Sequence, residues 1–231
     1  RGYNVLMVDL PGQGLLPDSG LTFQVDSAAP ISAALDWLEV NAAARSAQIA
    51  IYGVSGGGYF TAQAVVADPR LTAWVAATPI LDIAAVFRRE FGRALDAPGW
   101  ALNTLMRLAG TVNAIAAVNL DKYAWQFGTA DFKSAAQGVL AQARLVDCSR
   151  VTIPTLLLLS EGEGGELRRQ TLALLDEFTQ RGVDVTLREF TDAEGADGHC
   201  QLNNLRLAQT VVFDWLDRVF NHDSGDVRLL C

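Results

Sequence analysis

The sequence has few of the residues from which disulfide frameworks and metal sites are built. Its 231 residues include three cysteines and two histidines. The cysteines, Cys148, Cys200 and Cys231, are odd in number and show no C-x-x-C spacing. This pattern fits neither a disulfide framework nor a zinc site. We therefore expect no metal and no organic cofactor, with a reducing cytoplasm as the default location.

Long apolar runs and clusters of basic residues are also absent. No stretch approaches the roughly 20 apolar residues that a membrane helix needs, so we expect no membrane partner. Lysine and arginine total 18 against 26 acidic residues, which gives a net charge of −8. Because phosphate binding requires a basic face, we expect no nucleic-acid partner either.

Apolar residues, by contrast, are abundant. Hydrophobic residues make up 50% of the chain and charged residues 19%, which is the balance of a globular rather than a disordered protein. A chain of this length can bury the core of one α/β domain and still have room for an inserted lid.

Short apolar runs alternate with helical patterns, and this predicts an α/β fold with a doubly wound, mostly parallel sheet. The first run is near-continuous, as in a strand covered on both faces, and the last alternates as an edge strand does. The predicted strands are 4–10, 48–54, 71–77, 154–160 and 184–190. The predicted helices run from Asp26 or Ser27 to Asn41, from the second strand to Ala67, from Leu167 to Gln180, and across Leu205 to Val219.

The alternation stops in residues 81–151, where apolar and aromatic residues lie in helical stretches broken by proline and glycine. About 70 residues without a strand are too many for a simple crossover. We predict a helical lid inserted between a first core part, 1–80, and a second core part, 152–231, over the strand ends where ligands bind. The alternative is a small helical domain with an ordinary core. In either case its aromatic residues could form the interface of a homodimer.

The run Gly53-Val54-Ser55-Gly56-Gly57 separates an apolar strand from an alanine-rich helix. Strand, sharp turn and helix in this order predict a nucleophile elbow, in which the serine is strained and the flanking glycines avoid collisions. The turn would lift the Ser55 hydroxyl out of the sheet, beside the helix N-terminus. The N–H of Gly56 would then hold an oxyanion. The alternative is a glycine-rich turn with a solvated serine.

A serine hydroxyl is a poor nucleophile unless a base, usually a histidine oriented by a carboxylate, lies within hydrogen-bonding distance. His199 follows the last predicted strand, where it can lean over the strand ends toward Ser55. His222 lies in a polar tail after the last helix, where a solvated surface histidine is the better explanation. We therefore predict that His199 is the base and that His222 is exposed.

The acid is expected just after the predicted strand 154–160, whose end lies on the same rim as the elbow. Glu161, Glu163 and Glu166 all fit this position. We prefer Glu163, because a residue three past the apolar run clears the strand and can turn toward the histidine. Glu166 ranks second, with a first-turn helix residue as its alternative role, and Asp82 ranks third.

The glycine-flanked serine, the acidic turn and the late histidine together resemble the α/β-hydrolase superfamily. More narrowly, Glu161-Gly162-Glu163, residues 194–201 (Glu-Gly-Ala-Asp-Gly-His-Cys-Gln) and residues 212–216 (Val-Phe-Asp-Trp-Leu) resemble one branch of it. That branch contains the fungal polyketide-shortening hydrolases of pigment synthesis and the bacterial dihydroxy-pseudooxynicotine hydrolase, which cleave carbon-carbon bonds next to a ketone.

The resemblance implies a serine hydrolase whose substrate is a small acyl compound or a β-diketone. One alternative is a carboxylesterase or a peptidase-like acyl hydrolase. An alternative from another class is a non-catalytic ligand-binding module on the same fold.

The chain departs from the pattern of the superfamily in two ways. The acid of the family is more often aspartate, so the choice among the three glutamates stays open. Such hydrolases also carry strands before the one at Asn4, and a loop among them supplies an oxyanion N–H beside that of Gly56. Since the chain opens on Arg1 without a methionine, we expect a fragment of a longer enzyme. As an isolated polypeptide it should be poorly soluble or inactive.

Overall fold

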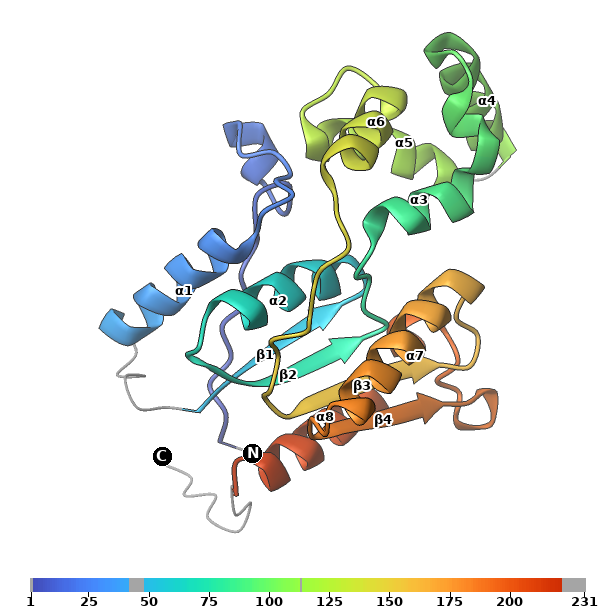
Figure 1. Ribbon diagram of the computed structural model, residues 1–231. Coiled ribbons are helices and arrows are strands. Elements are labelled where there is room, and N and C mark those ends of the chain that lie inside the picture. The colour runs from blue at the N-terminus through green and yellow to red at the C-terminus, as the bar shows by residue number, and fades with distance from the viewer. Residues whose placement is uncertain (1, 42–47, 113, 222–231) are drawn as a thin grey trace, which may run out of the picture. The chain divides into compact units, whose positions relative to one another are not determined.

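The computed structural model describes residues 2–41, 48–112 and 114–221 (Figure 1). The chain divides into an α/β unit and a helical unit. The α/β unit comprises Arg1–Met7, Ser32–Leu81 and Val146–Cys231, and the helical unit comprises Val8–Ile31 and Asp82–Leu145. None of the helices in the described ranges is both long enough and apolar enough to cross a lipid bilayer.

The α/β unit is built on a parallel sheet with the strand order β1-β2-β3-β4. Four of the predicted strands are thereby confirmed, and β4 lies at an edge, as its alternating sequence indicated. The strands are β1 (Ile49–Val54), β2 (Leu71–Ala77), β3 (Thr155–Ser160) and β4 (Val185–Phe190).

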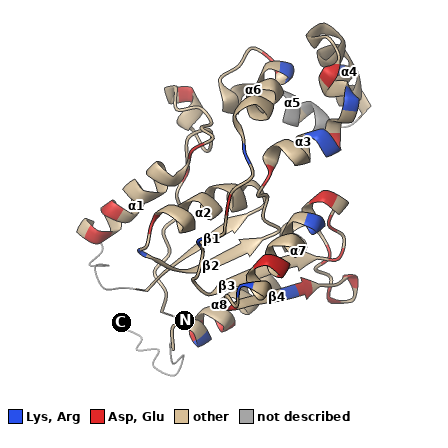
Figure 2. Ribbon diagram, viewed as in Figure 1, with Lys and Arg blue, Asp and Glu red and all other residues tan. Residues whose placement is uncertain are grey.

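Helices cover both faces of this sheet (Figure 1). Successive side chains of a strand point to opposite faces, so Val75 of β2 packs with α8 (Leu205–Val219) in one buried cluster. Trp74 packs on the other face with α2 (Gly56–Ala67) and α7 (Gly165–Gln180). Burial on both faces explains why β2 and β3 carry no charged residue (Figure 2).

The helix α1 (Ala28–Asn41) is tied to the turn that precedes β2 by a charged cluster. The guanidinium of Arg70 lies 2.6 Å from a carboxylate oxygen of Asp36 and 2.6 Å from one of Asp68. Ser32 Oγ donates to Asp68 at 2.7 Å.

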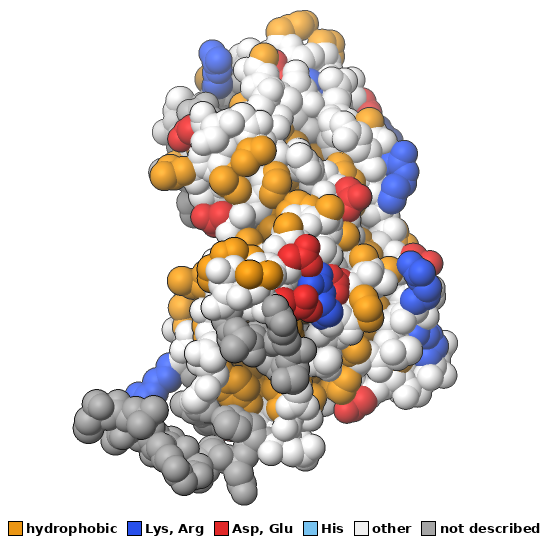
Figure 3. Space-filling model, turned by 90° about the vertical axis from the view of Figure 1, so that its left-hand side faces the viewer, with side chains coloured by type: hydrophobic (Ala, Val, Ile, Leu, Met, Phe, Trp, Pro, Cys, Tyr) orange, Lys and Arg blue, Asp and Glu red, His pale blue; other side chains and the backbone are white. Residues whose placement is uncertain are grey.

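On the face drawn in Figure 3, charged side chains of both signs lie among exposed apolar ones.

The helical unit has a core of aromatic rings. Tyr123 of α5 lies against Phe87 of α3 and Phe132 of α6, with ring centroids 5.7 and 5.8 Å apart. The elements of this unit are η1 (Leu16–Ser19), α3 (Ile83–Phe91), η2 (Gly92–Asp96), α4 (Gly99–Val112), α5 (Ala114–Phe127) and α6 (Phe132–Gln142).

Residues 8–31 lie in this helical unit, whereas the sequence analysis assigned residues 1–80 to the core. Phe23 accounts for part of the difference. Its ring stacks on that of Phe127 with centroids 4.4 Å apart, and its N–H donates to the carbonyl of Gln126 at 2.7 Å. The sequence could not reveal this attachment, because the two segments are about a hundred residues apart.

The predicted strand at residues 4–10 is wrong for the described chain. These residues adopt no regular structure, and Val5 and Met7 are 74% and 91% exposed. A strand needs a hydrogen-bonded neighbour, and β1, β2, β3 and β4 pair with one another rather than with this segment. The apolar run therefore has the composition of a strand without the partner that would make it one.

Candidate active site

Ser55 occupies the turn between β1 and α2, with φ 53° and ψ −116°. A positive φ is unfavourable for a non-glycine residue, and three backbone hydrogen bonds hold it there. The N–H of Ser55 donates to the carbonyl of Ala77 at 2.8 Å. The carbonyl of Ser55 accepts from Gly58 at 2.8 Å and from Ile80 at 3.2 Å. The strained serine is thus anchored to the end of the neighbouring strand.

The glycines around Ser55 have different roles. A Cβ at Gly53 would lie 2.4 Å from Thr61 Oγ1, and one at Gly58 would lie 2.6 Å from the Cα of Pro79. A Cβ at Gly57 would meet nothing within 4 Å. The close approaches therefore require glycine at positions 53 and 58. At Gly57, where the sequence motif predicted such a requirement, a side chain would be accommodated.

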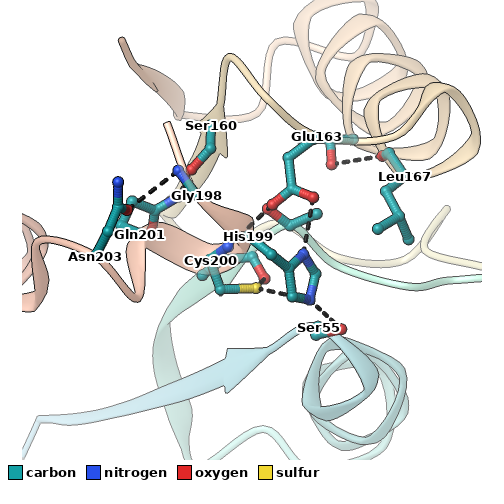
Figure 4. A network of polar contacts seen from close by, with 12 residues as sticks. Ser55, Ser160, Glu163, Leu167, Gly198, His199, Cys200, Gln201 and Asn203 are labelled. Atoms are coloured by element: carbon teal, nitrogen blue, oxygen red, sulfur yellow. Dashed lines mark hydrogen bonds and ion pairs between the residues drawn. The ribbon is translucent and has the colours of Figure 1, made fainter. Parts of the chain in front are cut away.

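Three side chains from distant parts of the chain meet above the strand ends (Figure 4). His199, in the short helix η4 (His199–Gln201), has its Nε2 3.0 Å from Ser55 Oγ. Its Nδ1 lies 2.8 Å from Glu163 Oε2, in the turn between β3 and α7. The structure therefore brings together the serine, the histidine and the preferred glutamate of the sequence analysis.

The hydrogen-bond partners determine the tautomer of His199. An ionised carboxylate can only accept, so Nδ1 carries the hydrogen that is donated to Glu163. In the neutral imidazole, Nε2 is then an acceptor facing the Ser55 hydroxyl. This is the arrangement in which a histidine can remove a proton from serine.

Glu163 is held by contacts beyond His199. Its side chain is only 2% exposed, and its Oε1 accepts from Thr78 Oγ1 at 2.6 Å and from the backbone N–H of Cys200 at 3.0 Å. Burial raises the pKa of Glu163, but the hydrogen bonds from His199, Thr78 and Cys200 outweigh it and leave the pKa below its ordinary value. The carboxylate therefore stays ionised at neutral pH.

The pKa of His199 is shifted upward. The contacts with the sulfur of Cys200 and with the carboxylate of Glu163 raise it, and partial burial opposes them. A negative neighbour stabilises the imidazolium, which forms when the ring accepts a proton. Glu163 therefore both orients the ring and increases its basicity.

The loop that carries His199 is fixed by contacts to the end of β3. Gln201 Nε2 donates to Ser160 Oγ at 2.8 Å (Figure 4). Ser160 Oγ in turn donates to the carbonyl of Ala196 at 3.1 Å. The N–H of Gly162 donates to the carbonyl of Asp197 at 3.2 Å, and a Cβ at Gly162 would lie 2.7 Å from that oxygen. The turn bearing Glu163 and the loop bearing His199 are thus held together.

The other acidic candidates make different contacts. Glu161 Oε2 accepts from the N–H of Asp192 at 3.1 Å, and Glu166 pairs with Arg169 at 2.6 Å. Asp82 caps α3, accepting from the N–H of Ala85 at 2.8 Å.

Two further site predictions concern Gly56 and His222. Gly56 is the first residue of α2, where N–H groups have no intrahelical acceptor. A Cβ there would meet nothing within 4 Å, so the space beside it is open. His222, which we expected to be exposed, lies outside the described residues.

Sequence reasoning missed Thr78 and Cys200, although both contact Glu163. They and Ser55 are three of the non-glycine residues with positive φ in the described chain, at 47°, 52° and 53°. Strained residues concentrate at functional sites. For Thr78 a usable signal existed, because it directly follows β2 and the ends of parallel strands share one rim. For Cys200 the contact comes from a backbone N–H, which carries no sequence signal.

Thr78→Val should destabilise the protein. The substitution keeps the shape of the side chain but leaves Glu163 Oε1, a buried charged acceptor, without one of its donors. We expect the free energy of unfolding to fall by about 1.5 to 3 kcal/mol in urea denaturation. Thr210→Val is the control, because the hydroxyl of that exposed helix residue donates to the carbonyl of Arg206 and its loss should change stability by less than about 0.5 kcal/mol. Equal stabilities would show that the Thr78 hydrogen bond contributes nothing.

Comparison with known proteins assigns the chain to a family. The profile of the X-Pro dipeptidyl-peptidase (S15) family matches residues 1–182, which include the elbow and Glu163. The chain belongs to the X-Pro dipeptidyl-peptidase (S15) family. It has the α/β-hydrolase fold, as the sequence motifs predicted.

Individual relatives agree with the α/β-hydrolase fold. The chain is 42% identical to the alpha/beta hydrolase UcsC from Acremonium sp over 88 residues, which are 35% of this chain and 18% of UcsC. Among solved structures, 2,6-dihydroxy-pseudo-oxynicotine hydrolase gives a TM-score of 0.57 at 19% identity, covering 91% of this chain and 51% of its own. AbyA5 gives 0.58 at 19% identity, covering 87% and 51%. The chain therefore spans about half the length of these two structures and less of UcsC.

Proposed function

We propose that this S15-family protein is a serine hydrolase in which Ser55 is the nucleophile, His199 the general base and Glu163 the residue that orients the base. The observation that carries the proposal is the continuous line of contacts from Ser55 Oγ through the imidazole to Glu163, at 3.0 and 2.8 Å. Nucleophile and base within hydrogen-bonding distance, with a third group behind the base, are the structural signature of covalent catalysis by serine.

The chemistry would proceed through an acyl-serine. Ser55 Oγ attacks the substrate carbonyl carbon as its proton moves to His199 Nε2, and the carbonyl oxygen becomes an oxyanion. The N–H of Gly56, at the start of α2, would donate to that oxyanion, and the partial positive charge of the helix N-terminus would add to the stabilisation. His199 then gives its proton to the leaving group. Water releases the acyl group, with His199 again acting as the base.

We propose further that the bond cleaved is a carbon-carbon bond next to a ketone. In a β-diketone the leaving carbon departs as an enolate, because the second carbonyl delocalises its charge, and the proton held by His199 neutralises it. Support comes from the resemblance of Glu161-Gly162-Glu163 and residues 194–201 to the hydrolases that cut such bonds. Ester or amide hydrolysis uses the same three residues, and the family match favours an acyl hydrolase of the peptidase type as the second candidate.

Side-by-side assays of three substrates should separate these activities. We expect the intact protein to cleave a β-diketone such as 1-phenyl-1,3-butanedione at least about tenfold faster, in kcat/KM, than p-nitrophenyl acetate or an X-Pro p-nitroanilide. Turnover of the ester or the anilide without cleavage of the diketone would contradict the carbon-carbon assignment while leaving the serine hydrolase in place.

Covalent labelling tests whether the protein is an enzyme at all. A fluorophosphonate reacts with an activated serine, and we expect it to modify Ser55 alone, as located by peptide mass analysis. A protein that binds the diketone but is neither labelled nor active would instead be a non-catalytic binding module.

The proposed lid has a separate test. If the helical unit contacts the substrate, substitution of its aromatic residues should change kcat/KM more for the diketone than for the small acetate ester. Tyr123→Phe is a mild change of this kind, because it keeps the ring packed between Phe87 and Phe132.

A further inference from the structure

Cys200 places a sulfur beside the imidazole nitrogen that faces the serine. Its Sγ lies 3.5 Å from His199 Nε2, and Ser55 Oγ lies 3.0 Å from the same nitrogen. Here the sulfur and nitrogen come from adjacent residues of η4, and the oxygen from the elbow. None of the proposed hydrolytic steps uses the thiol.

The spacing of these atoms is that of ligands to one metal ion. Zinc binds thiolate sulfur at about 2.3 Å and imidazole nitrogen at about 2.0 to 2.1 Å in tetrahedral geometry, which separates the two ligand atoms by about 3.6 Å. The observed distance of 3.5 Å between Cys200 Sγ and His199 Nε2 meets this requirement without movement. Ser55 Oγ, 3.0 Å from the same nitrogen, lies next to this position and would have to rotate off the lone pair of Nε2 to act as a third ligand.

The surroundings of His199 also fit a metal ligand. Glu163 accepts from Nδ1 at 2.8 Å, and a carboxylate on the far nitrogen is the usual support for a metal-bound histidine, because it fixes the ring and the tautomer. Ligand atoms of Glu163, His199 and Cys200 all lie within 4.8 Å of one another. The side chain of His199 is 45% exposed, so an ion can reach Nε2 from solvent.

We propose that His199 Nε2 and Cys200 Sγ, with Ser55 Oγ or water completing the coordination, form an inhibitory site for Zn²⁺ and similarly thiophilic divalent cations such as Cd²⁺. Binding forms metal–sulfur and metal–nitrogen bonds and releases the thiol proton to solvent. A bound ion occupies the lone pair of Nε2 that would accept the serine proton, so hydrolysis stops. Metal binding itself does not depend on the proposed function, whereas inhibition rests on it.

Calorimetric titration of the intact protein with ZnCl₂ tests the site directly. We expect one ion per chain and a dissociation constant at least about tenfold larger for Cys200→Ser, since serine is a much poorer ligand. Cys148→Ser is the matched control. Cys148 is also buried, but in the core cluster with Trp74 and Phe178, and burial raises its pKa to about 12, so its loss should leave the affinity unchanged. Equal affinities for the original protein and Cys200→Ser would overturn the proposal.

A second measurement keeps the test independent of the folding of that variant. Cd²⁺ added to the unmodified protein should produce the ultraviolet absorption of a cadmium–thiolate bond, and His199→Ala should abolish it. Absence of this absorption at saturating Cd²⁺ would exclude a thiolate ligand.

Activity assays separate this inference from the proposed function. Zn²⁺ should inhibit substrate cleavage in proportion to site occupancy, and EDTA should restore it. Metal binding without any hydrolase activity would contradict the proposed function and leave the metal site intact. Hydrolysis that saturating Zn²⁺ does not affect would overturn the inhibitory site and leave the hydrolase intact.

Discussion

Ser55→Ala is expected to lower the turnover of any substrate that the protein cleaves by about 10⁴- to 10⁶-fold, because it removes the atom that attacks the carbonyl. Stability should hardly change. The hydroxyl is hydrogen-bonded to the imidazole, and the backbone bonds from Gly58 and Ile80 that hold the turn do not involve the side chain. We expect a melting temperature within about 2 °C of the original protein.

The control for this variant is Ser19→Ala, an exposed serine in η1, which should alter neither rate nor melting temperature. Retention of even a tenth of the activity in Ser55→Ala would show that this serine is not the nucleophile. Fluorophosphonate labelling of the same variant gives an independent answer, since the modification should disappear with the hydroxyl.

Glu163→Gln is expected to reduce kcat by about 10³- to 10⁴-fold, somewhat less than Ser55→Ala. An uncharged amide no longer stabilises the imidazolium or requires the hydrogen to stay on Nδ1. Glu161→Gln and Glu166→Gln are the matched controls, because these carboxylates contact Asp192 and Arg169 rather than His199. If Glu166→Gln is the damaging change and Glu163→Gln is silent, the acid is Glu166.

The pH dependence of the same variant follows from the shifted pKa of His199. The base must be neutral to act, so kcat/KM of the original protein should rise with pH. The midpoint of this rising limb should lie above the ordinary histidine pKa of about 6.5. Removing the charge of Glu163 removes one of the contacts that raise this pKa, and the limb should shift to lower pH. A limb at unchanged pH in Glu163→Gln would show that the carboxylate does not act on the base.

The stability of the fold should depend on pH through the same residue. A histidine whose pKa is higher in the folded state binds its proton more tightly there. Its contribution to stability is therefore complete below about pH 6.5 and is lost as the pH rises through the folded pKa.

Much of the site could be predicted from the sequence, because the residues that define it follow recognisable strands and helices. The elbow at Ser55 is strand, turn and helix within a few residues, so glycine spacing and apolar runs were enough to locate it. His199 could be chosen because only two histidines exist and one follows a strand. Glu163 could be preferred because strand ends in a parallel sheet share a rim, which turns position after a strand into position in space.

Tertiary structure alone decided the features that depend on partners far along the chain. Thr78 lies 85 residues from the Glu163 that it contacts, and Phe23 lies about a hundred from Phe127. The need for glycine at position 58 rather than 57 comes from Pro79, which passes the helix start at 2.6 Å from where a Cβ would be.

Composition likewise marked residues 4–10 as a strand, but strands exist only as hydrogen-bonded pairs. The sequence by itself determined which segments have the composition to form strands, helices and a nucleophile elbow. Which backbone groups pair and which atoms crowd each glycine were decided only in three dimensions, because those contacts join residues whose separation in sequence carries no signal.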